Sequence, residues 1–357
     1  MEGKCIYWLE ELRSSDNGIV GKKCANLGEL TQGGFRVPPG FALSITAYER
    51  FMMESQVKDE IAYYLRNFKA EPKNMSDALE FERIAKDIRA IVESKKMPSD
   101  LEEEVRRYYR ELCQKTNRPD LSVATRSAGP SSHPGQYETY LHVRGEEEVV
   151  RNIIRVWSST FNARSLLARA RHRLPLDYDH IGVAVLTMVD AKAAGVMFTL
   201  NPVNGDLSKI VIEGSWGLGE AVVSGSVTPD SFVVDKIVLA IEDKRIATKL
   251  RQYAYNTQIG SMEYQDTPLS LVNSPCLEDK EILELARVAK KMEGYFGCAQ
   301  DVEWSIAKDL PFPENIFLVQ TRPESVWSKK KQGPLLGEKT GLELLFAQAT
   351  TPIKVKF

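Results

Sequence analysis

Four segments of this sequence combine residue types that bind phosphate or a hard metal ion. In the first segment, Lys23 follows Gly21 and precedes a helical run. A lysine at a helix start can meet a phosphate together with the free N–H groups of the first helical turn. In the second segment, Arg126 ends a strand-like run and precedes a loop of small residues, 127–136. The arginine fork suits phosphate oxygens, and such a loop brings backbone N–H groups close to them. A solvated lysine beside a turn and an ordinary surface loop are the alternatives.

The third segment is glycine-rich and reads EGSWGLGE over residues 213–220. It lacks the closing Gly-Lys-Ser/Thr of a Walker motif. Tight turns and close packing therefore explain its glycines as well as ligand binding does.

The fourth segment consists of two strand-like runs near the end of the chain. Alternate residues of a strand share a face, so Asp301 shares one with Glu303, and Gln320 shares one with Arg322. If the two strands pair, a carboxylate, an amide and a guanidinium converge. Carboxylate and amide oxygens suit Mg²⁺, and arginine can neutralise a transferring phosphoryl group. A surface ion pair is the alternative.

A mixture of helices and strands must position these segments. Apolar residues recur with the helix period over 46–115 and 146–172, and a helix is also expected over 278–295. Strand-like runs occupy 6–9, 121–125, a β-rich region at 181–236, and two closing segments at 301–306 and 316–320. The pattern predicts an α+β or α/β fold and goes no further.

Composition and charge exclude several classes of protein. The chain has 357 residues, of which 43% are hydrophobic and 27% charged, and its formal charge is -2. This balance excludes disordered and collagen-like chains. The net charge also gives no overall positive potential that would attract nucleic acid or an anionic membrane. Five cysteines without a CxxC pair, and no signal-like N-terminus, favour reduced thiols and a cytoplasmic protein.

The order of these segments resembles the N-terminal nucleotide-binding module of the pyruvate phosphate dikinase and phosphoenolpyruvate synthase family. The matching pieces are GKKCANLGEL, GFRVPPGFALS, VATRS, PGQYETYL, AGVMFT with NP, EGSWGLGEAVVSGSVTPD, DVEWS and LVQTRPE. The resemblance implies an ATP-grasp fold in the α+β class, with ATP and Mg²⁺ in a cleft between two subdomains. The implied subdomains span 1–178, with a helical insertion at about 46–115, and 179–327. Residues 328–357 are then a linker and tail, with possible docking to a partner.

The resemblance also implies a role for each matching residue. Phosphates would be held at Lys23, Arg126 and the following loop, and adenine would contact a hinge around 186–189. Glu303 and Gln320 would hold Mg²⁺ or the nucleotide, and Arg322 would stabilise charge during transfer. The implied binding set is Lys23, Arg126, Ser127, Gly135, Met188, Val189, Glu303, Gln320 and Arg322, with Glu303 and Gln320 as metal ligands. The implied catalytic set is Arg126, Glu303, Gln320 and Arg322.

Three departures from the family pattern affect the expected function. The hinge glutamine common in the synthases is Leu186 here, and the loop after Arg126 is shorter than the synthase loop. The family's carrier histidine follows Thr-Ser or Thr-Cys in a glycine-rich stretch, and none of the four histidines has that context. We therefore expect a histidine-bearing partner subunit that carries the phosphoryl group and binds the acceptor.

These observations predict the ATP-binding catalytic subunit of a split dikinase. It would transfer the β-phosphoryl group of ATP to a histidine of the partner and release AMP and phosphate. By resemblance to phenylphosphate synthase of anaerobic phenol degradation, the final acceptor would be phenol. The alternatives are an isolated nucleotide-binding domain of phosphoenolpyruvate synthase or rifampin phosphotransferase, and a non-catalytic ATP-binding regulatory subunit. Leu342, Leu344, Leu345 and Phe346 in the tail are candidates for partner docking or for packing onto their own domain.

Overall fold

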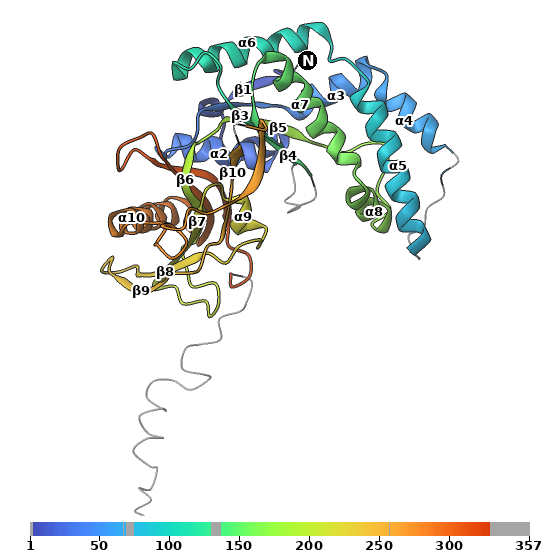
Figure 1. Cartoon of the computed structure of the whole chain (residues 1–357). Helices are drawn as coiled ribbons and strands as arrows, with labels where there is room; N and C mark the ends of the chain where they lie inside the picture. The colour runs from blue at the N-terminus through green and yellow to red at the C-terminus, as the bar shows by residue number, and fades with distance from the viewer. Residues whose placement is uncertain (1–2, 67, 69–74, 130–136, 257, 329–357) are drawn as a thin grey trace, which may run out of the picture.

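The computed structural model describes residues 3–66, 68, 75–129, 137–256 and 258–328. Two large antiparallel sheets, a separate two-stranded hairpin and the helices that cover the sheets make up this part of the chain (Figure 1). The mixture confirms the predicted α+β class. The predicted tail and its apolar residues at 342–346 lie outside the described residues.

The first sheet has five strands and belongs to the N-terminal half. In spatial order they are β1 (Ile6–Trp8), β2 (Gly40–Leu43), β5 (Gly182–Thr187), β3 (Val123–Ala128) and β4 (Thr139–Val143). All neighbouring pairs are antiparallel. The central strand β5 is almost wholly apolar because both of its faces are covered, one by each hydrophobic cluster of the protein.

Helices cover one face of this sheet (Figure 1). They are α3 (Ile45–Glu54), α4 (Val57–Leu65), α5 (Met75–Glu93), α6 (Ser99–Thr116), α7 (Glu146–Ser158) and α8 (Ala163–Arg171). Val149, Ile153 and Trp157 of α7 recur every four residues and are buried against the sheet. The glutamates that open α7 complement the positive end of its dipole.

The second sheet has six strands in the order β13, β12, β6, β7, β8, β9. Their bounds are β6 (Ala191–Phe198), β7 (Lys209–Trp216), β8 (Asp230–Asp235), β9 (Ile241–Arg245), β12 (Gln300–Ala307) and β13 (Ile316–Pro323). Helix α10 (Asp279–Phe296) packs against one face through Leu285, Ala289 and Met292. The separate hairpin of β10 (Arg251–Asn256) and β11 (Ser261–Asp266), with α9 (Glu220–Val223), lies beside this sheet.

Helix α2 (Lys22–Gln32) joins the two sheets. Its buried face shares the second hydrophobic cluster with strands of both, and the Asn26 amide donates to the Thr321 carbonyl over 2.9 Å. Gly21 precedes the helix with φ of +81°, and a Cβ there would stand 1.8 Å from the Ala128 carbonyl oxygen. This close approach fixes the start of α2 beside the end of β3. The remaining helical turns are η1 (Leu9–Glu11), η2 (Ser14–Asp16), α1 (Asn17–Val20) and η3 (Ser159–Phe161).

The structure corrects one predicted element and adds strands that were not predicted, which are β4, β9 and the two strands of the hairpin. The single helix expected over 146–172 is broken into α7, η3 and α8. The cause is Asn162, whose side-chain oxygen accepts from the Ser165 N–H over 2.9 Å and so starts a new helix. The β10–β11 hairpin was not predicted. Among the described residues, no helix is both long and apolar enough to cross a bilayer.

Candidate functional site

A cavity of about 1230 Å³ opens between the two sheets. Its walls come from the start of α2, from β3, β4 and the hinge after β5, and from β6, β7, β12 and β13. Every predicted site residue that the structure describes lines this cavity: Lys23, Arg126, Ser127, Met188, Val189, Glu303, Gln320 and Arg322. Gly135 lies outside the described residues.

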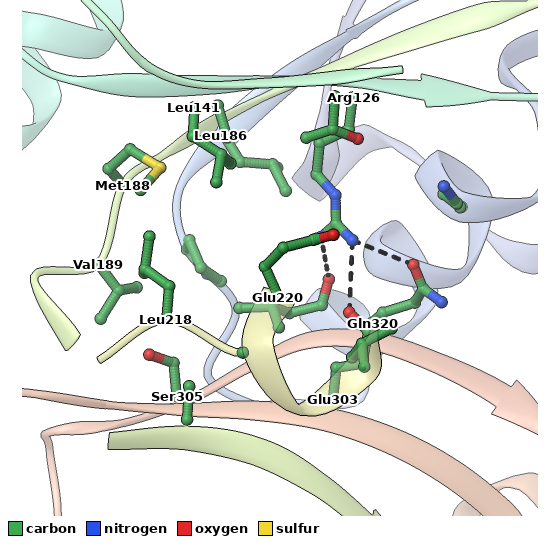
Figure 2. A pocket seen from close by; sticks show the side chains of 18 of the residues that line it. Arg126, Leu141, Leu186, Met188, Val189, Leu218, Glu220, Glu303, Ser305 and Gln320 are labelled. Carbon is green, nitrogen blue, oxygen red and sulfur yellow. Dashed lines mark hydrogen bonds and ion pairs between the residues drawn. The ribbon is translucent and has the colours of Figure 1, made fainter. Parts of the chain in front are cut away.

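Arg126 crosses the cavity from β3 to the second sheet (Figure 2). Its Nη1 donates to the Val319 carbonyl over 3.0 Å. Its Nη2 donates to Gln320 Oε1 over 3.2 Å and lies 3.4 Å from Glu303 Oε2. One guanidinium therefore holds two side-chain oxygens of different strands at a single point.

Strands β12 and β13 pair in the way that their alternation predicts. Glu303 lies opposite Gln320, and Asp301 lies opposite Arg322, whose Nε donates to Asp301 Oδ2 over 3.1 Å. The carboxylate of Glu303 and the amide oxygen of Gln320 both contact the Arg126 guanidinium. Carboxylate and amide oxygens are ligands that Mg²⁺ prefers. These residues therefore fit a magnesium ion. The side chain of Arg322 is 48% exposed, so it can turn toward a ligand at the cavity mouth.

The row of acidic groups continues across the second sheet. Val196 lies opposite Glu303 on one side and opposite Glu213 on the other, so both glutamates share a face. Burial raises the pKa of Glu213. Burial also raises the pKa of Asp301, against the opposing effect of the Arg322 guanidinium. Each of these carboxylates would be stabilised in its charged form by a bound cation.

Lys23 lines the same cavity, where Arg126 and Glu303 act on its charge in opposite directions. Burial, and next the positive charge of Arg126, lower the pKa of Lys23 to about 8, while Glu303 acts in the opposite direction. Two cationic side chains, Lys23 and Arg126, thus share one partly buried space, and the charge of each disfavours that of the other. A bound anion would stabilise both charges.

The opposite end of the cavity is apolar. Leu141, Leu186, Met188, Val189 and Leu218 point into it (Figure 2). The hinge that carries three of them is fixed by its backbone, because the Thr187 N–H donates to the Pro39 carbonyl over 2.8 Å and the Met188 N–H to the Ser122 carbonyl over 2.9 Å. A pocket with a charged end and an apolar end suits a ligand with an anionic part and a flat aromatic part.

The β10–β11 hairpin closes one side of the cavity. The rings of His142 on β4 and Tyr255 on β10 lie 3.3 Å apart between centroids, so the hairpin reaches the first sheet. At its other side, the Leu218 N–H donates to the Tyr253 carbonyl over 2.9 Å. Gly217 allows that approach, because φ is +78° and a Cβ would stand 2.5 Å from the same carbonyl oxygen. The glycine-rich segment therefore has a packing role.

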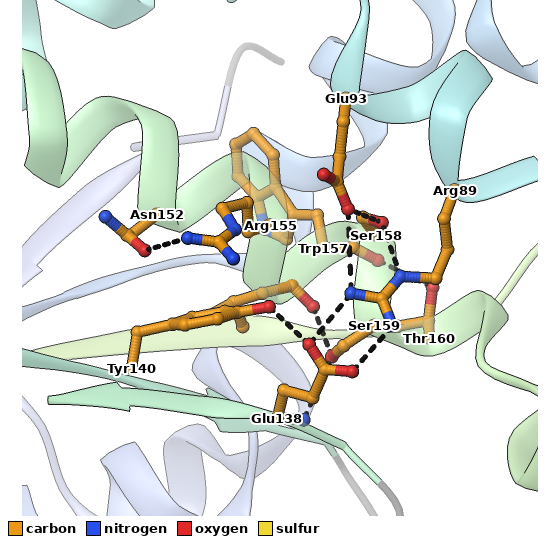
Figure 3. A network of polar contacts seen from close by, with 11 residues as sticks. Arg89, Glu93, Glu138, Tyr140, Asn152, Arg155, Trp157, Ser158, Ser159 and Thr160 are labelled. Atoms are coloured by element: carbon orange, nitrogen blue, oxygen red, sulfur yellow. Dashed lines mark hydrogen bonds and ion pairs between the residues drawn. The ribbon is translucent and has the colours of Figure 1, made fainter. Parts of the chain in front are cut away.

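A polar network ties the helical layer to the cavity wall (Figure 3). Arg89 of α5 donates to both carboxylate oxygens of Glu138, over 2.6 and 2.9 Å. The backbone N–H of Glu138 donates to Ser159 Oγ over 3.1 Å, and Tyr140 also contacts its carboxylate. Glu138 lines the cavity and directly precedes β4. The helical layer therefore fixes the entry of β4.

Several polar lining residues were absent from the predicted binding and catalytic sets, among them four on or beside the strands of the second sheet. They are Glu213, Glu220, Asp301 and Ser305. Strand alternation alone places residues 301 and 305 on the face of Glu303, so this signal was available. Glu213 and Glu220 open and close the glycine-rich segment, whose sequence did not distinguish packing from binding.

Residues 17–340 match the family described as "Pyruvate phosphate dikinase, AMP/ATP-binding domain". The chain belongs to this family. Membership confirms the resemblance on which the sequence prediction rests, and it fits the expected use of ATP and Mg²⁺.

Similar curated proteins carry the name phosphoenolpyruvate synthase. The probable enzyme of Staphylothermus marinus is 39% identical over 93% of this chain and 42% of its own length. The enzyme of Aeropyrum pernix is 37% identical over 93% of this chain and 44% of its own length. That of Methanothermobacter thermautotrophicus is 36% identical over 90% of this chain and 46% of its own length.

The chain therefore spans less than half the length of these three relatives. Their names support the synthase alternative better than the phenylphosphate synthase interpretation, for which the comparisons give no support. They also do not show the dependence on a separate partner subunit that the sequence led us to expect.

Proposed function

We propose that this chain is the ATP-binding part of a phosphoenolpyruvate synthase-like dikinase, with an ATP-grasp arrangement of two subdomains. The sequence placed their boundary between residues 178 and 179, but β5 (Gly182–Thr187) is the central strand of the first sheet, so we place the boundary at the hinge after β5. The observation that carries the proposal is the convergence of Glu303 and Gln320 on Arg126, next to Lys23, at one end of a cavity whose other end is apolar. The matching family is itself defined by an AMP/ATP-binding domain.

In this proposal the triphosphate lies at the charged end and adenine lies at the apolar end. Lys23, Arg126 and Ser127 bind phosphate oxygens, and Met188 and Val189 contact the base. Binding an anion stabilises the protonated state of Lys23 and balances the charge of Arg126. Leu186 offers the base an apolar contact and no hydrogen bond, so the hinge backbone and other walls must recognise its edges.

Glu303 and Gln320 would hold Mg²⁺, which neutralises charge on the phosphates when bound. Arg126 then exchanges its contacts with these two side chains for phosphate oxygens. Arg322 stabilises the negative charge that develops during transfer. A histidine nitrogen, on a further domain or a partner subunit, bonds to the β-phosphorus as the bond from that phosphorus to the AMP oxygen breaks. Water then releases the γ-phosphate as inorganic phosphate.

A label-transfer experiment tests this function. The purified chain is mixed with Mg²⁺, ATP labelled in the β-phosphate, and soluble extract of the cells that make it. We expect acid-labile label on a histidine, and pyruvate should discharge that label into phosphoenolpyruvate. The Glu303→Gln variant should give no labelled histidine.

The chase also separates the alternatives. Discharge by phenol instead of pyruvate would restore the phenylphosphate synthase interpretation. Binding of ATP without any histidine label, in extract with demonstrated phosphotransferase activity, would contradict a dikinase and indicate a regulatory ATP-binding protein.

A further inference from the structure

We propose that the Ser305 hydroxyl is a hydrogen-bonding contact for the nucleoside part of the bound nucleotide, and that it contributes to selection of that nucleoside. The inference deepens the proposed function and rests on it. It concerns the end of the cavity where the side chain at the hinge, Leu186, supplies no polar atom.

The Ser305 hydroxyl is buried without a hydrogen-bond partner among the described residues. The residue is only 4% exposed. Proteins seldom leave a buried hydroxyl unpaired, because its lost hydration is not repaid. Ser305 nevertheless lines the cavity, and Figure 2 shows its hydroxyl directed into that space. A ligand atom in the cavity would complete its hydrogen bonding.

Ser305 also lies on the same strand as Glu303 and faces the same cavity. Ser305 follows Glu303 by two residues on β12, and the partners opposite them on β6 are Ala194 and Val196. The two side chains therefore share the cavity face, about 7 Å apart along the strand. Glu303 contacts Arg126 at the charged end, whereas Ser305 lies further along β12 toward Lys308, whose N–H donates over 2.9 Å to the Asp190 carbonyl beside the hinge. A neutral hydroxyl at this distance from the phosphate contacts faces the nucleoside.

Two other described lining residues carry a buried unpaired nitrogen, and neither is placed in the same way. They are His142, through Nε2, and Trp304, through Nε1. The His142 ring lies against Tyr255 of the hairpin, with the two ring planes tilted by 34°. Trp304 is fully buried in the core, where a Cβ on Gly214 would come within 2.7 Å of its ring. Of these three unpaired groups on the described cavity wall, Ser305 is therefore the best placed for this contact.

The sheet provides a matched control in Ser215. This residue lies opposite Ala194 on β7, in the same row as Ser305. It is 1% exposed, and its Oγ likewise has no partner in the described part of the chain. It does not line the cavity. Ser215→Ala therefore removes an equivalent unpaired hydroxyl without touching the proposed contact.

The test compares the dissociation constants of ATP and of inorganic tripolyphosphate by calorimetry, with Mg²⁺ present. We expect Ser305→Ala to weaken ATP binding about tenfold, which corresponds to about 1.4 kcal/mol, and to leave tripolyphosphate binding unchanged. Ser215→Ala should change neither constant. Both variants should keep the wild-type melting temperature or exceed it, because each loses only an unpaired hydroxyl.

Nucleotide analogues distinguish the two sources of the contact. If Ser305 donates to a ring nitrogen, one of 1-deaza-, 3-deaza- and 7-deaza-ATP should bind the wild type tenfold more weakly than ATP. That analogue and ATP should then bind Ser305→Ala with equal affinity. If it contacts the ribose, 2′-deoxy- or 3′-deoxy-ATP should behave in that way. Equal ATP affinity in wild type and Ser305→Ala would overturn this inference alone, as would an equal loss for tripolyphosphate. A wild-type chain that binds no ATP would overturn the proposed function with it.

Discussion

Lys23 should make the affinity for ATP depend strongly on pH. In the free protein its pKa is about 8, because its ammonium is buried and faces Arg126. A bound triphosphate places several negative charges in that space, so the pKa should return at least to the ordinary 10.5. Protonated Lys23 therefore binds ATP better than neutral Lys23 does. The affinity should be high below about pH 8 and fall as the pH rises between the two pKa values.

The two pKa values fix the size of the effect. A shift from about 8 to 10.5 predicts that the association constant for ATP falls roughly 25-fold between about pH 7 and pH 9.5. The same linkage predicts uptake of about 0.9 proton per ATP bound at about pH 9. This pH lies above the titration of the ATP phosphates, so their protons do not contribute.

Calorimetry in buffers of different ionisation enthalpy measures both quantities. Lys23→Arg keeps a permanent positive charge and should bind ATP with little dependence on pH over this range. Lys23→Met should bind weakly at every pH and take up no proton. Lys22→Met is the matched control, because it also removes a lysine from the cavity wall but should keep the wild-type slope. A wild-type slope in Lys23→Met, or no proton uptake by the wild type, would refute the assignment.

Three further predictions concern the elements that shape the cavity. Lys249→Met should lower the free energy of unfolding by about 3–5 kcal/mol in urea titrations. The Lys249 ammonium lies 2.6 Å from the fully buried Asp230 carboxylate, which the variant leaves without a cation. An unchanged midpoint would contradict this. Gly21→Ala should cost about 1–3 kcal/mol and weaken ATP binding, because it strains the start of α2, and equal stability would show that the turn can relax. Tyr255→Ala should speed dissociation of ATP several-fold in stopped-flow experiments, because the hairpin loses its contact with His142; a wild-type rate would exclude a closing role.

Much of the fold could be predicted because local patterns determine it. Strand alternation placed Asp301 and Glu303 on one face, and the pairing with β13 that the structure shows brings them opposite Arg322 and Gln320. The break at Asn162 was missed because the apolar period runs through it, and only the capping bond to Ser165 ends the helix. The β10–β11 hairpin was missed because its strands are mixed in polarity and half-exposed. Its position depends on contacts with distant residues.

The site was predicted as a set of residues, whereas its geometry required the structure. The motifs identified Arg126 and Glu303, which are 177 residues apart in the sequence. No local pattern shows that the same guanidinium reaches the Val319 carbonyl, or that it lowers the pKa of Lys23. Ser305 was overlooked because its importance comes from a missing hydrogen-bond partner, which sequence cannot reveal.

The position of the phosphates beside Arg126 is tested by the dissociation constant of magnesium ATP for the wild type and for Arg126→Gln, measured side by side by calorimetry. We expect saturable binding of one ATP per chain, weakened roughly 30- to 150-fold in the variant, because a charged hydrogen-bonding group is worth about 2–3 kcal/mol. Melting curves of the two proteins serve as the control for folding. Equal affinity in a folded Arg126→Gln variant would contradict the placement of the phosphates at this end of the cavity.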